Sequence, residues 1–580
     1  MNLNYSFNMK QIIRSFFLSV FFIPLAVIAQ EKKVDFFGSG RFNLNNSSLS
    51  GELLNKDTTT ARKQMTGYTL FDLGFHIRPS EETEIKAITR VTNDINGFWG
   101  GGITFYLREL YLRGILFKRV KYQVGDLNTR MTPYTLYNNL GELSSNNPKA
   151  LNTFSEIITY DKFYGTNSWR QQGATADMGF DFTKYLNHVH ITGLITKNRQ
   201  TDYFSTPDRL LSGATIEARA FKQLTLSYNN THVFDVKNSA MFAGGQFKNT
   251  VHSFGLEEKL SLKEMPLALK AEFGKSVVSY ENITNAPTIP NGAFLDAGFD
   301  LQNKQKTWSI GASYRSVETN YRSMGAQSRR VDFSKTTSEY PYYTNREVPR
   351  PISSMDMLTD GGIYNMFLGT DLKAYNPAYE NMLPYGKATP NRQGADMHVA
   401  WAAPKQVLKL GVNGAYYNEI TGQGTSNLRT FNNVEGFADL ALSDLYKGKK
   451  KLHVSVYARM QNTKRDGSEG IDKIDLKTSQ LKTGIEFEII PKLELQVAAI
   501  MIQAKGNEYL AQRNSFNEIN FYKAYSAKLN ETLLIGGINY QFSKHNCLKL
   551  QYQQSNWDNQ LLPENQYKIN RFTVLYNLFF

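Results

Sequence analysis

Cysteine is almost absent from this sequence, which has a single one, Cys547, among 580 residues. One cysteine excludes an internal disulfide and any cysteine-based zinc or iron–sulfur centre. Long apolar runs are absent too, because no stretch reaches the roughly 18 apolar residues that a transmembrane helix needs. With 41% hydrophobic and 13% aromatic residues the chain is too apolar to be disordered, so several soluble domains or one large barrel remain.

Motifs of known catalytic chemistry are missing as well: there is no nucleophile elbow, Walker loop or Rossmann glycine run. His188 and His190 share one strand face but lack an evident third metal ligand. Asp466, Asp472 and Asp475 lack the bidentate acid and the order of a calcium loop. We therefore expect no enzyme, no cofactor and no metal. A protease or lipase site assembled from distant residues at the rim of a barrel stays open as an alternative.

The N-terminus has the pattern of a secretory signal peptide. Lys10 and Arg14 precede an apolar stretch from Phe16 to Ala29 that is too short to anchor the chain. We expect residues 1–29 to be removed by cleavage before Gln30, with Met9 as an alternative start. No cysteine stands directly after this cleavage site, so we expect no lipid anchor.

The rest of the chain alternates with a period of two. Near the C-terminal end, Leu548, Leu550 and Tyr552 fall on one side of an extended segment, and Lys549 and Gln551 fall on the other. The same pattern recurs in many segments of about ten residues, whereas helical periodicity is nearly absent. Strands of this length and number fit a transmembrane barrel better than a soluble sandwich.

The connections between these segments alternate between short and long. Short links at 182–187, 221–224, 262–267, 403–408, 489–494 and 542–546 are each followed by a longer polar loop. We predict a single all-β, antiparallel up-and-down barrel of residues 30–580, with about 22 strands (about 18–24). Short turns and both termini are expected on the periplasmic side, and long loops outside.

The end of the chain alternates to a terminal aromatic residue. Phe572, Val574, Tyr576, Leu578 and Phe580 would all lie on one face, directed toward lipid. Here the sequence resembles bacterial outer-membrane barrels, and this resemblance implies that the last strand is the signal for the barrel-assembly machinery. The segment 105–126 resembles strands of bacterial porins. The many Asn, Tyr and Lys residues resemble proteins of the Bacteroidota, a Gram-negative group.

The positive charge is explained without a nucleic-acid partner. Removal of Lys10 and Arg14 with the signal lowers the formal net charge from +14 to +12, and basic residues such as Lys118, Lys263 and Lys492 gather in the short turns. There they would face the anionic headgroups of the membrane, at a gain of about 1 kcal/mol per residue. The expected partners are outer-membrane lipid and lipopolysaccharide, not nucleic acid.

A set of polar residues on three neighbouring segments is predicted to face the lumen. These candidates are Lys86, Arg90, Glu109, Arg113, Lys121 and Gln123. They would form a charged wall that steers solutes, or they would only pair across strands and hydrate the wall. Both interpretations stay open.

Two long loops, at about 129–170 and about 319–392, exceed what a plain barrel needs. Few residues separate Gln30 from the first strand at Val34, so we expect no plug domain there, unlike in TonB-dependent transporters. A wide open barrel would leak, and we therefore expect the second loop to constrict the lumen. The constriction candidates are Arg329, Arg330, Asp332, Arg346, Glu347, Arg350, Asp356 and Asp360.

The sequence thus predicts an outer-membrane, porin-like channel for passive or weakly selective passage of small hydrophilic solutes. The alternative is a barrel that does not conduct and serves as a docking or structural component of an envelope complex, for secretion, barrel assembly or glycan uptake. The aromatic loops are consistent with both, because they could pack against a protein partner as readily as against the barrel wall.

Overall fold

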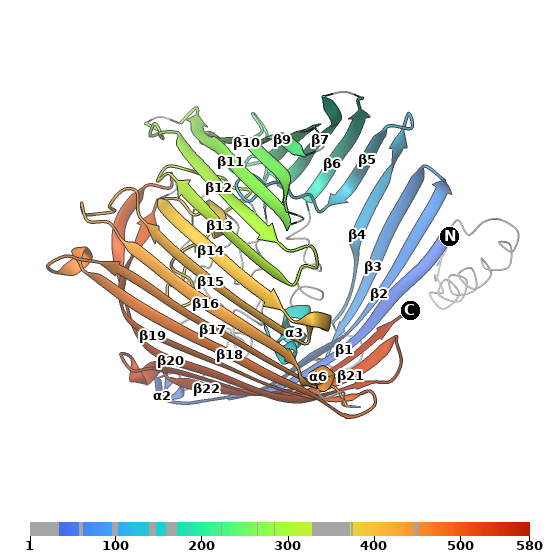
Figure 1. Ribbon diagram of the computed structural model, residues 1–580, viewed down its shortest axis with the longest axis vertical. Helices are drawn as coiled ribbons and strands as arrows, with labels where there is room; N and C mark the ends of the chain where they lie inside the picture. The colour runs from blue at the N-terminus through green and yellow to red at the C-terminus, as the bar shows by residue number, and fades with distance from the viewer. Residues whose placement is uncertain are drawn as a thin grey trace, which may run out of the picture.

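Consecutive strands pair antiparallel along the whole chain, and the last strand returns to the first, so that the sheet closes into a barrel (Figure 1). This computed structural model describes residues 34–56, 62–95, 102–137, 147–157, 171–183, 185–221, 223–263, 265–283, 285–327, 372, 375–445, 450–514 and 516–580. The expected signal segment, residues 1–29, lies outside the described residues.

The sheet has 22 strands, as predicted. They are β1 (Val34–Ser50), β2 (Lys63–Ser80), β3 (Thr83–Asp94), β4 (Ile103–Leu116), β5 (Val120–Leu127), β6 (Gln171–Asp181), β7 (Leu186–Arg199), β8 (Arg209–Ala220), β9 (Leu224–Asp235), β10 (Gln246–Leu262), β11 (Met265–Glu281), β12 (Gly292–Gln302), β13 (Trp308–Val317), β14 (Arg392–Ala402), β15 (Leu408–Asn418), β16 (Thr430–Ala441), β17 (Leu452–Arg465), β18 (Ile474–Ile490), β19 (Leu493–Arg513), β20 (Ile519–Gln541), β21 (Asn546–Asn559) and β22 (Tyr567–Phe579).

Helices are few and short in the residues that the structure describes. They are α2 (Leu53–Lys56), α3 (Lys149–Glu156), α6 (Leu442–Leu445) and the 3-10 turns η4 (Gly386–Ala388), η5 (Pro404–Gln406), η6 (Gly470–Asp472) and η7 (Pro563–Asn565). None of the helices in the described parts of the chain is long and apolar enough to cross a membrane.

The seam of the barrel joins β1 to β22. The backbone N–H of Gly38 donates to the carbonyl of Phe580 (3.0 Å), and the N–H of Phe580 donates to the carbonyl of Gly38 (3.1 Å). From Ser39 to Ser50 the two strands continue in register, residue opposite residue. The start of β1 at Val34 and the C-terminal Phe580 therefore lie at the end of the barrel that carries the short turns, as predicted.

The short turns coincide with the links that the sequence indicates. Several of them place a lysine in the left-handed backbone region, for example Lys118 (φ 59°), Lys263 (φ 48°) and Lys492 (φ 73°). The long connections, which include 128–170 and 318–391, leave from the opposite end of the barrel. The two ends therefore differ as the alternation of short and long links predicts.

The outer and inner faces of the wall have opposite character. Outward residues are apolar and exposed, as in Phe36 (63% exposed), Phe105 (70%) and Val434 (58%). Inward residues of the same strands are mostly polar, and several, such as Asn43 and Asn433, are buried. An apolar exterior around a polar interior is typical of barrels that cross a membrane.

One strand is only weakly marked in the sequence. The region near 517–530 belongs to β20, which has 23 residues and pairs with the 21-residue β19. Ala527 and Leu529 are buried on one face of this region, but the exposed Lys523 interrupts the apolar pattern on the same face. The alternation that identifies a strand is therefore weak here.

The ladder of paired residues is shortest between β4 and β5, whose ribbons diverge in Figure 1. β5 has 8 residues, and its ladder with β4 covers only Tyr111–Leu116. Gly125 lies at the end of this ladder with φ 109°, where an added Cβ would meet the Leu110 carbonyl oxygen at 2.4 Å. Beside it, the Asp126 carboxylate accepts the Leu110 N–H (2.7 Å) and so terminates the ladder.

The apolar band predicts that a charged residue on the outer face of β16 destabilises the fold by an amount that depends on its depth in the membrane. Val434→Arg should lower the free energy of unfolding by about 2–4 kcal/mol, because it puts a guanidinium into lipid at mid-depth. Asn432→Arg, one outward position higher on the same strand, is the matched control and should cost about 0–1 kcal/mol. Urea unfolding in liposomes measures both. Equal costs would contradict the placement of the band.

Candidate functional site

The predicted lumen residues of β3 and β4 do lie on the inner wall, where they form ion pairs across strands. Arg90 is completely buried, and its Nε and Nη2 donate to the two carboxylate oxygens of Asp72, each at 2.6 Å. Arg108 Nη1 donates to Asp72 Oδ2 at 2.7 Å. One carboxylate of β2 therefore holds an arginine from each of the next two strands.

Sequence reasoning missed Asp72 and Arg108. Asp72 lies directly opposite Arg90 in the ladder of β2 and β3. Arg108 faces inward because a bulge interrupts the ladder of β3 and β4 between Ile88 and Thr89, so that Arg108 and Glu109 both reach the lumen. Strict alternation would have directed Arg108 to lipid. A bulge is a property of the pairing between two strands, and one strand's sequence does not mark it.

Most of the other candidates on this wall are paired too. Lys86 Nζ lies 3.2 Å from Glu109 Oε1, and Arg113 pairs with Glu84. Glu84 also accepts from His76 Nε2 (2.7 Å).

The two candidates on β5 differ from one another. Gln123 donates to the backbone carbonyl of Asp126 (2.7 Å), whereas Lys121 has no ion pair within the described ranges. Of the two interpretations, the contacts favour a paired and hydrated wall over an unpaired charged ladder.

The first long loop folds into the barrel. The Tyr134 hydroxyl donates to Asp296 Oδ2 on β12 (2.6 Å) and accepts from Arg315 Nε on β13 (2.8 Å). The ring of Tyr134 stacks on Phe294, with the ring centroids 4.0 Å apart. The loop leaves β5 and so reaches a wall seven strands further along the sheet.

The same loop then crosses to the opposite wall, where α3 packs against β18, β19 and β20 in the interior of the barrel (Figure 1). The Lys149 ammonium lies 2.7 Å from Glu486 Oε2 on β18. Gln551 on β21 donates to the carbonyl of Ala150 (2.7 Å). The wall offers an apolar floor here, since Ala150 and Leu151 pack in a cluster with Ile500.

The described end of the second long loop, 375–391, also lies against the inner wall. Asn381 donates to Glu508 (2.7 Å) and to Thr463 (2.8 Å), and Glu380 Oε2 pairs with Arg459 of β17 (2.6 Å). Tyr379 donates to Glu531 of β20 (2.7 Å). The described parts of both long loops therefore lie inside the lumen.

The eight constriction candidates between Arg329 and Asp360 lie outside the described residues. Their role stays a prediction. The described segments 319–327 and 375–391 on either side of them are inside the barrel.

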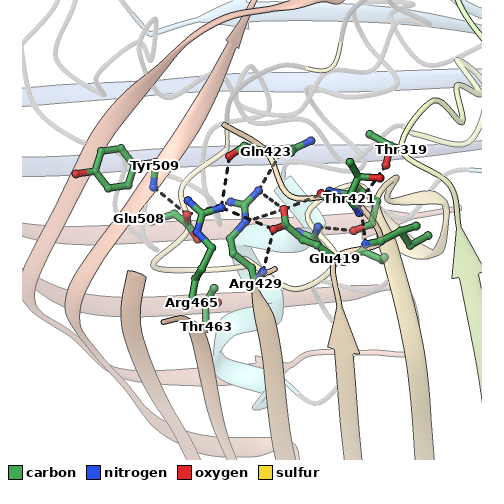
Figure 2. Close-up of polar contacts among 12 residues, drawn as sticks. Thr319, Glu419, Thr421, Gln423, Arg429, Thr463, Arg465, Glu508 and Tyr509 are labelled. Carbon is green, nitrogen blue, oxygen red and sulfur yellow. Dashed lines mark hydrogen bonds and ion pairs between the residues drawn. The ribbon is translucent and has the colours of Figure 1, made fainter. Parts of the chain in front are cut away.

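A buried charge cluster fixes the loop between β15 and β16 to the upper part of β19 (Figure 2). Glu419, Arg429 and Glu508 are nearly inaccessible to solvent. Arg429 Nη2 lies 2.5 Å from Glu419 Oε1, and its Nη1 lies 3.0 Å from Glu508 Oε1. Arg465 of β17 adds a second guanidinium, 3.9 Å from Glu419 Oε2. Removal of Arg429 would leave two buried carboxylates without their main counter-charge, and removal of Glu419 would leave two buried guanidinium groups with less.

Electrostatics in this cluster act on Glu419, which follows the last residue of β15. Burial by itself would raise the pKa of Glu419, but the Arg429 guanidinium outweighs burial and holds the pKa below its usual range. The pKa of Arg429 is raised, because Glu419 and Glu508 outweigh the effect of burial on its guanidinium. Both residues are therefore charged at neutral pH.

The hairpin of β19 and β20 spans the mouth of the barrel at the long-loop end. Phe516 at its tip meets Tyr280 of β11 edge to face, with the ring centroids 5.1 Å apart. β11 and β19 are not neighbours in the sheet, so the hairpin closes over the lumen from one side to the other. No local pattern in the sequence indicates this contact.

The residues of the alternative metal sites do not assemble a ligand set. His190 Nε2 lies 2.5 Å from Asp177 Oδ2, and His188 Nδ1 lies 2.7 Å from Asp181 Oδ1. Across the described parts of the chain, no group of three or more His, Cys, Asp or Glu side chains is placed to hold a metal ion.

The C-terminal residues proposed as an assembly signal lie on the outer face of β22. Phe572 and Phe580 are exposed, and the alternate residues Thr573, Leu575 and Asn577 are buried on the inner face. Their position fits recognition from the membrane side, and their role in assembly stays a prediction.

Comparisons with known proteins give only a distant structural likeness. No protein-family model matches the chain. No curated protein matches it in sequence. Among solved structures, OccK11 (OpdR) of Pseudomonas aeruginosa matches with a TM-score of 0.39 and 9% identity over 94% of this chain and 96% of that chain.

Two further solved structures match at a similar level. OccK8 (OprE) of Pseudomonas aeruginosa has a TM-score of 0.37 and 10% identity, over 94% of this chain and 98% of that one. A BenF-like porin from Pseudomonas fluorescens has a TM-score of 0.34 and 10% identity, over 95% and 99%. At such values no residue role transfers to this chain.

The shared carboxylate on the inner wall predicts a large effect of one isosteric change. Asp72→Asn should lower the free energy of unfolding by about 3–5 kcal/mol, because it removes the charge that both buried arginines face. Asp35→Asn is the control: its partner Arg78, at 3.1 Å, is about half exposed, so about 0–1 kcal/mol is expected. Urea unfolding of both variants in liposomes provides the measurement. A small effect at Asp72 would show that the buried pair contributes little.

The lowered pKa of Glu419 predicts a pH dependence. A carboxyl group whose pKa is lower in the folded state stabilises the fold above its unfolded pKa of about 4.3 and loses that contribution as the pH falls through its folded pKa. Glu419→Gln should therefore cost about 3–5 kcal/mol at pH 7, and the difference from wild type should shrink below about pH 4.

The matched control for this pH series is Asp466→Asn in the β17–β18 loop. The Asp466 side chain is 85% exposed beside Lys464, so its removal should change the unfolding free energy little at any pH. Unfolding in urea at pH 7, 5 and 3 gives the three comparisons. A wild-type advantage over Glu419→Gln that stays constant to pH 3 would contradict the ion pair as its source.

Proposed function

We propose that this protein is a porin-like channel of the outer membrane that passes small hydrophilic solutes through a lumen narrowed by its own loops. The observation that carries the proposal is the inward folding of both long loops against a polar, ion-paired wall. A wall of this kind hydrates a solute path. The loops reduce a lumen that would otherwise be as wide as those of plugged transporters.

The membrane context follows from the same features. The apolar outer band suits outer-membrane lipid, and the basic short turns suit the anionic headgroups beside it. A cleaved signal peptide, insertion by the barrel-assembly machinery through the last strand, and contact with lipopolysaccharide complete this proposal. The residues that constrict the path would include the predicted set between Arg329 and Asp360.

A second candidate function, docking in an envelope complex, has one observation in its favour. The loops 200–208 and 236–245 join through backbone hydrogen bonds, Met241 to Tyr203 (3.1 Å) and Phe242 to Phe204 (2.7 Å). The four side chains are 61–77% exposed beyond the long-loop end of the strands. Such an apolar tip suits a protein partner or the lipid interface equally well, so the channel remains the better supported function.

Cysteine accessibility tests the channel directly. In a Cys547→Ser background, Lys121→Cys places a thiol on the inner wall, and Val124→Cys places one on the outer face of the same strand. The purified protein should give steady single-channel currents in a planar bilayer. A negatively charged, water-soluble thiol reagent should change the current through Lys121→Cys and leave Val124→Cys unaltered. Deletion of 340–390 should raise the conductance severalfold.

Two results would contradict the proposal. One is the absence of current both in the wild type and in the deletion variant, in protein whose heat-modifiable mobility shows a folded barrel. The other is equal modification of the two cysteine variants. Recovery of a stoichiometric envelope partner together with the absence of current would favour docking.

A further inference from the structure

A cavity of about 270 Å³ lies at the long-loop end, beneath the tip of the β19–β20 hairpin. Its lining comes from β10 and β11, from the loops 285–290 and 319–327, and from the hairpin tip at 513–519. Ligand pockets in proteins commonly measure about 300–1,000 Å³, so this one suits a small molecule. It opens where a solute would enter the lumen.

One side of the cavity is apolar and aromatic. Tyr280 lies between Phe247 (ring centroids 5.4 Å apart) and Phe516 (5.1 Å). Ile289 and Met324 extend this surface. A hydrated ion would gain nothing from such a wall, whereas an aromatic or aliphatic body would bury its own apolar surface there.

The other side carries two guanidinium groups, those of Arg322 and Arg513. Arg513 Nη1 donates to the carbonyl of Asn517 (2.8 Å), and Arg513 forms no ion pair within the described ranges. Glu518, the single acid of the lining, is exposed, and its Oε2 accepts from Asn514 (2.8 Å). The lining thus has a net positive charge.

A buried amide nitrogen indicates where an oxygen of a ligand would bind. Asn517 is 7% exposed, and its Oδ1 accepts the Leu372 N–H at 3.5 Å. The amide nitrogen Nδ2 is buried without a hydrogen-bond partner. The backbone of Asn517 is left-handed (φ 65°), a conformation that asparagine adopts more readily than most residues, and the Leu372 N–H orients the amide through its oxygen. A buried donor left unpaired is costly, and an oxygen in the cavity would satisfy it.

We propose that this cavity binds a small organic anion, a carboxylate on an aromatic or aliphatic body. The carboxylate would accept from Arg513 and from the Asn517 amide, since guanidinium and carboxylate form strong charge-assisted hydrogen bonds. The body would pack on Phe247, Tyr280 and Phe516. The inference deepens the proposed channel function, because it names the class of solute that is captured at the mouth.

Equilibrium binding to the full-length protein in detergent tests the site without any need for conduction. The probes are benzoate, the neutral benzamide and the cationic benzylamine, titrated by saturation-transfer NMR. Benzoate should bind at least about tenfold more tightly than either of the others. Arg513→Gln and Asn517→Asp should each weaken benzoate binding by at least about tenfold, the first by removing the counter-charge and the second by adding a like charge.

The matched control is Arg219→Gln, which removes an exposed arginine of β8 at the short-turn end and should leave benzoate binding unchanged. A change of electrophoretic mobility on heating establishes that each variant is folded. If Arg513→Gln or Asn517→Asp does not fold, Arg322→Gln is tested in its place. Equal binding of benzoate and benzamide, or benzoate binding that both hairpin variants leave intact, would overturn the site. Benzoate binding without single-channel current would instead retain the site and reject the channel, and current without binding would do the reverse.

Discussion

Within the hydrocarbon of a membrane no water is present to pair with a free peptide group, so a sheet can cross only if it has no edges. In this protein that requirement is met at one seam, where β1 pairs with β22 and Gly38 exchanges backbone hydrogen bonds with Phe580. In a closed sheet every strand has a neighbour on each side, so its side chains can point only outward to lipid or inward to the lumen. Closure therefore imposes the alternation of apolar and polar residues on every strand. It also confines irregular chain to the two ends of the barrel and to its interior.

The loop segments that fill the interior are held there by contacts between side chains. Polar inward residues give way to apolar ones at the places where a loop docks. Ile500 and Ile535 meet α3, and Leu211 and Val233 meet Leu136 of the first loop. Buried charges provide the remaining attachment, since Glu486 holds Lys149 and Glu508 holds both Arg429 and Asn381. The inner wall is therefore a hydrated surface interrupted by docking sites, and the loops are positioned by those interruptions.

The architecture could be predicted from the sequence because the signals that specify it are local. Period-two alternation, short links and the aromatic end of β22 each involve residues close together in the chain, and 22 strands result. The contacts that build the interior join distant residues, such as Tyr134 with Arg315 and Lys149 with Glu486. No local pattern specifies such partners.

One signal for the interior was nevertheless present. Val497–Ile502 is apolar on both faces, which a strand between lipid and water would not need. This run marks the place where α3 packs. The six predicted lumen residues lie near their expected positions, but the partner of Arg90 is Asp72, which also holds Arg108 through a bulge that the sequence does not show.

The wall and its filling are thus stabilised by different forces. Backbone hydrogen bonds hold the wall, and low-dielectric surroundings make them expensive to break. Ion pairs and small apolar contacts hold the loops, and Phe516 against Tyr280 is a single aromatic contact at the tip of a long hairpin. Because the two sets of interactions share few residues, the loops and the hairpin are held independently of the ladders. In the proposed channel, selectivity would therefore depend on the loops and on the hairpin, and strand number alone would not determine it.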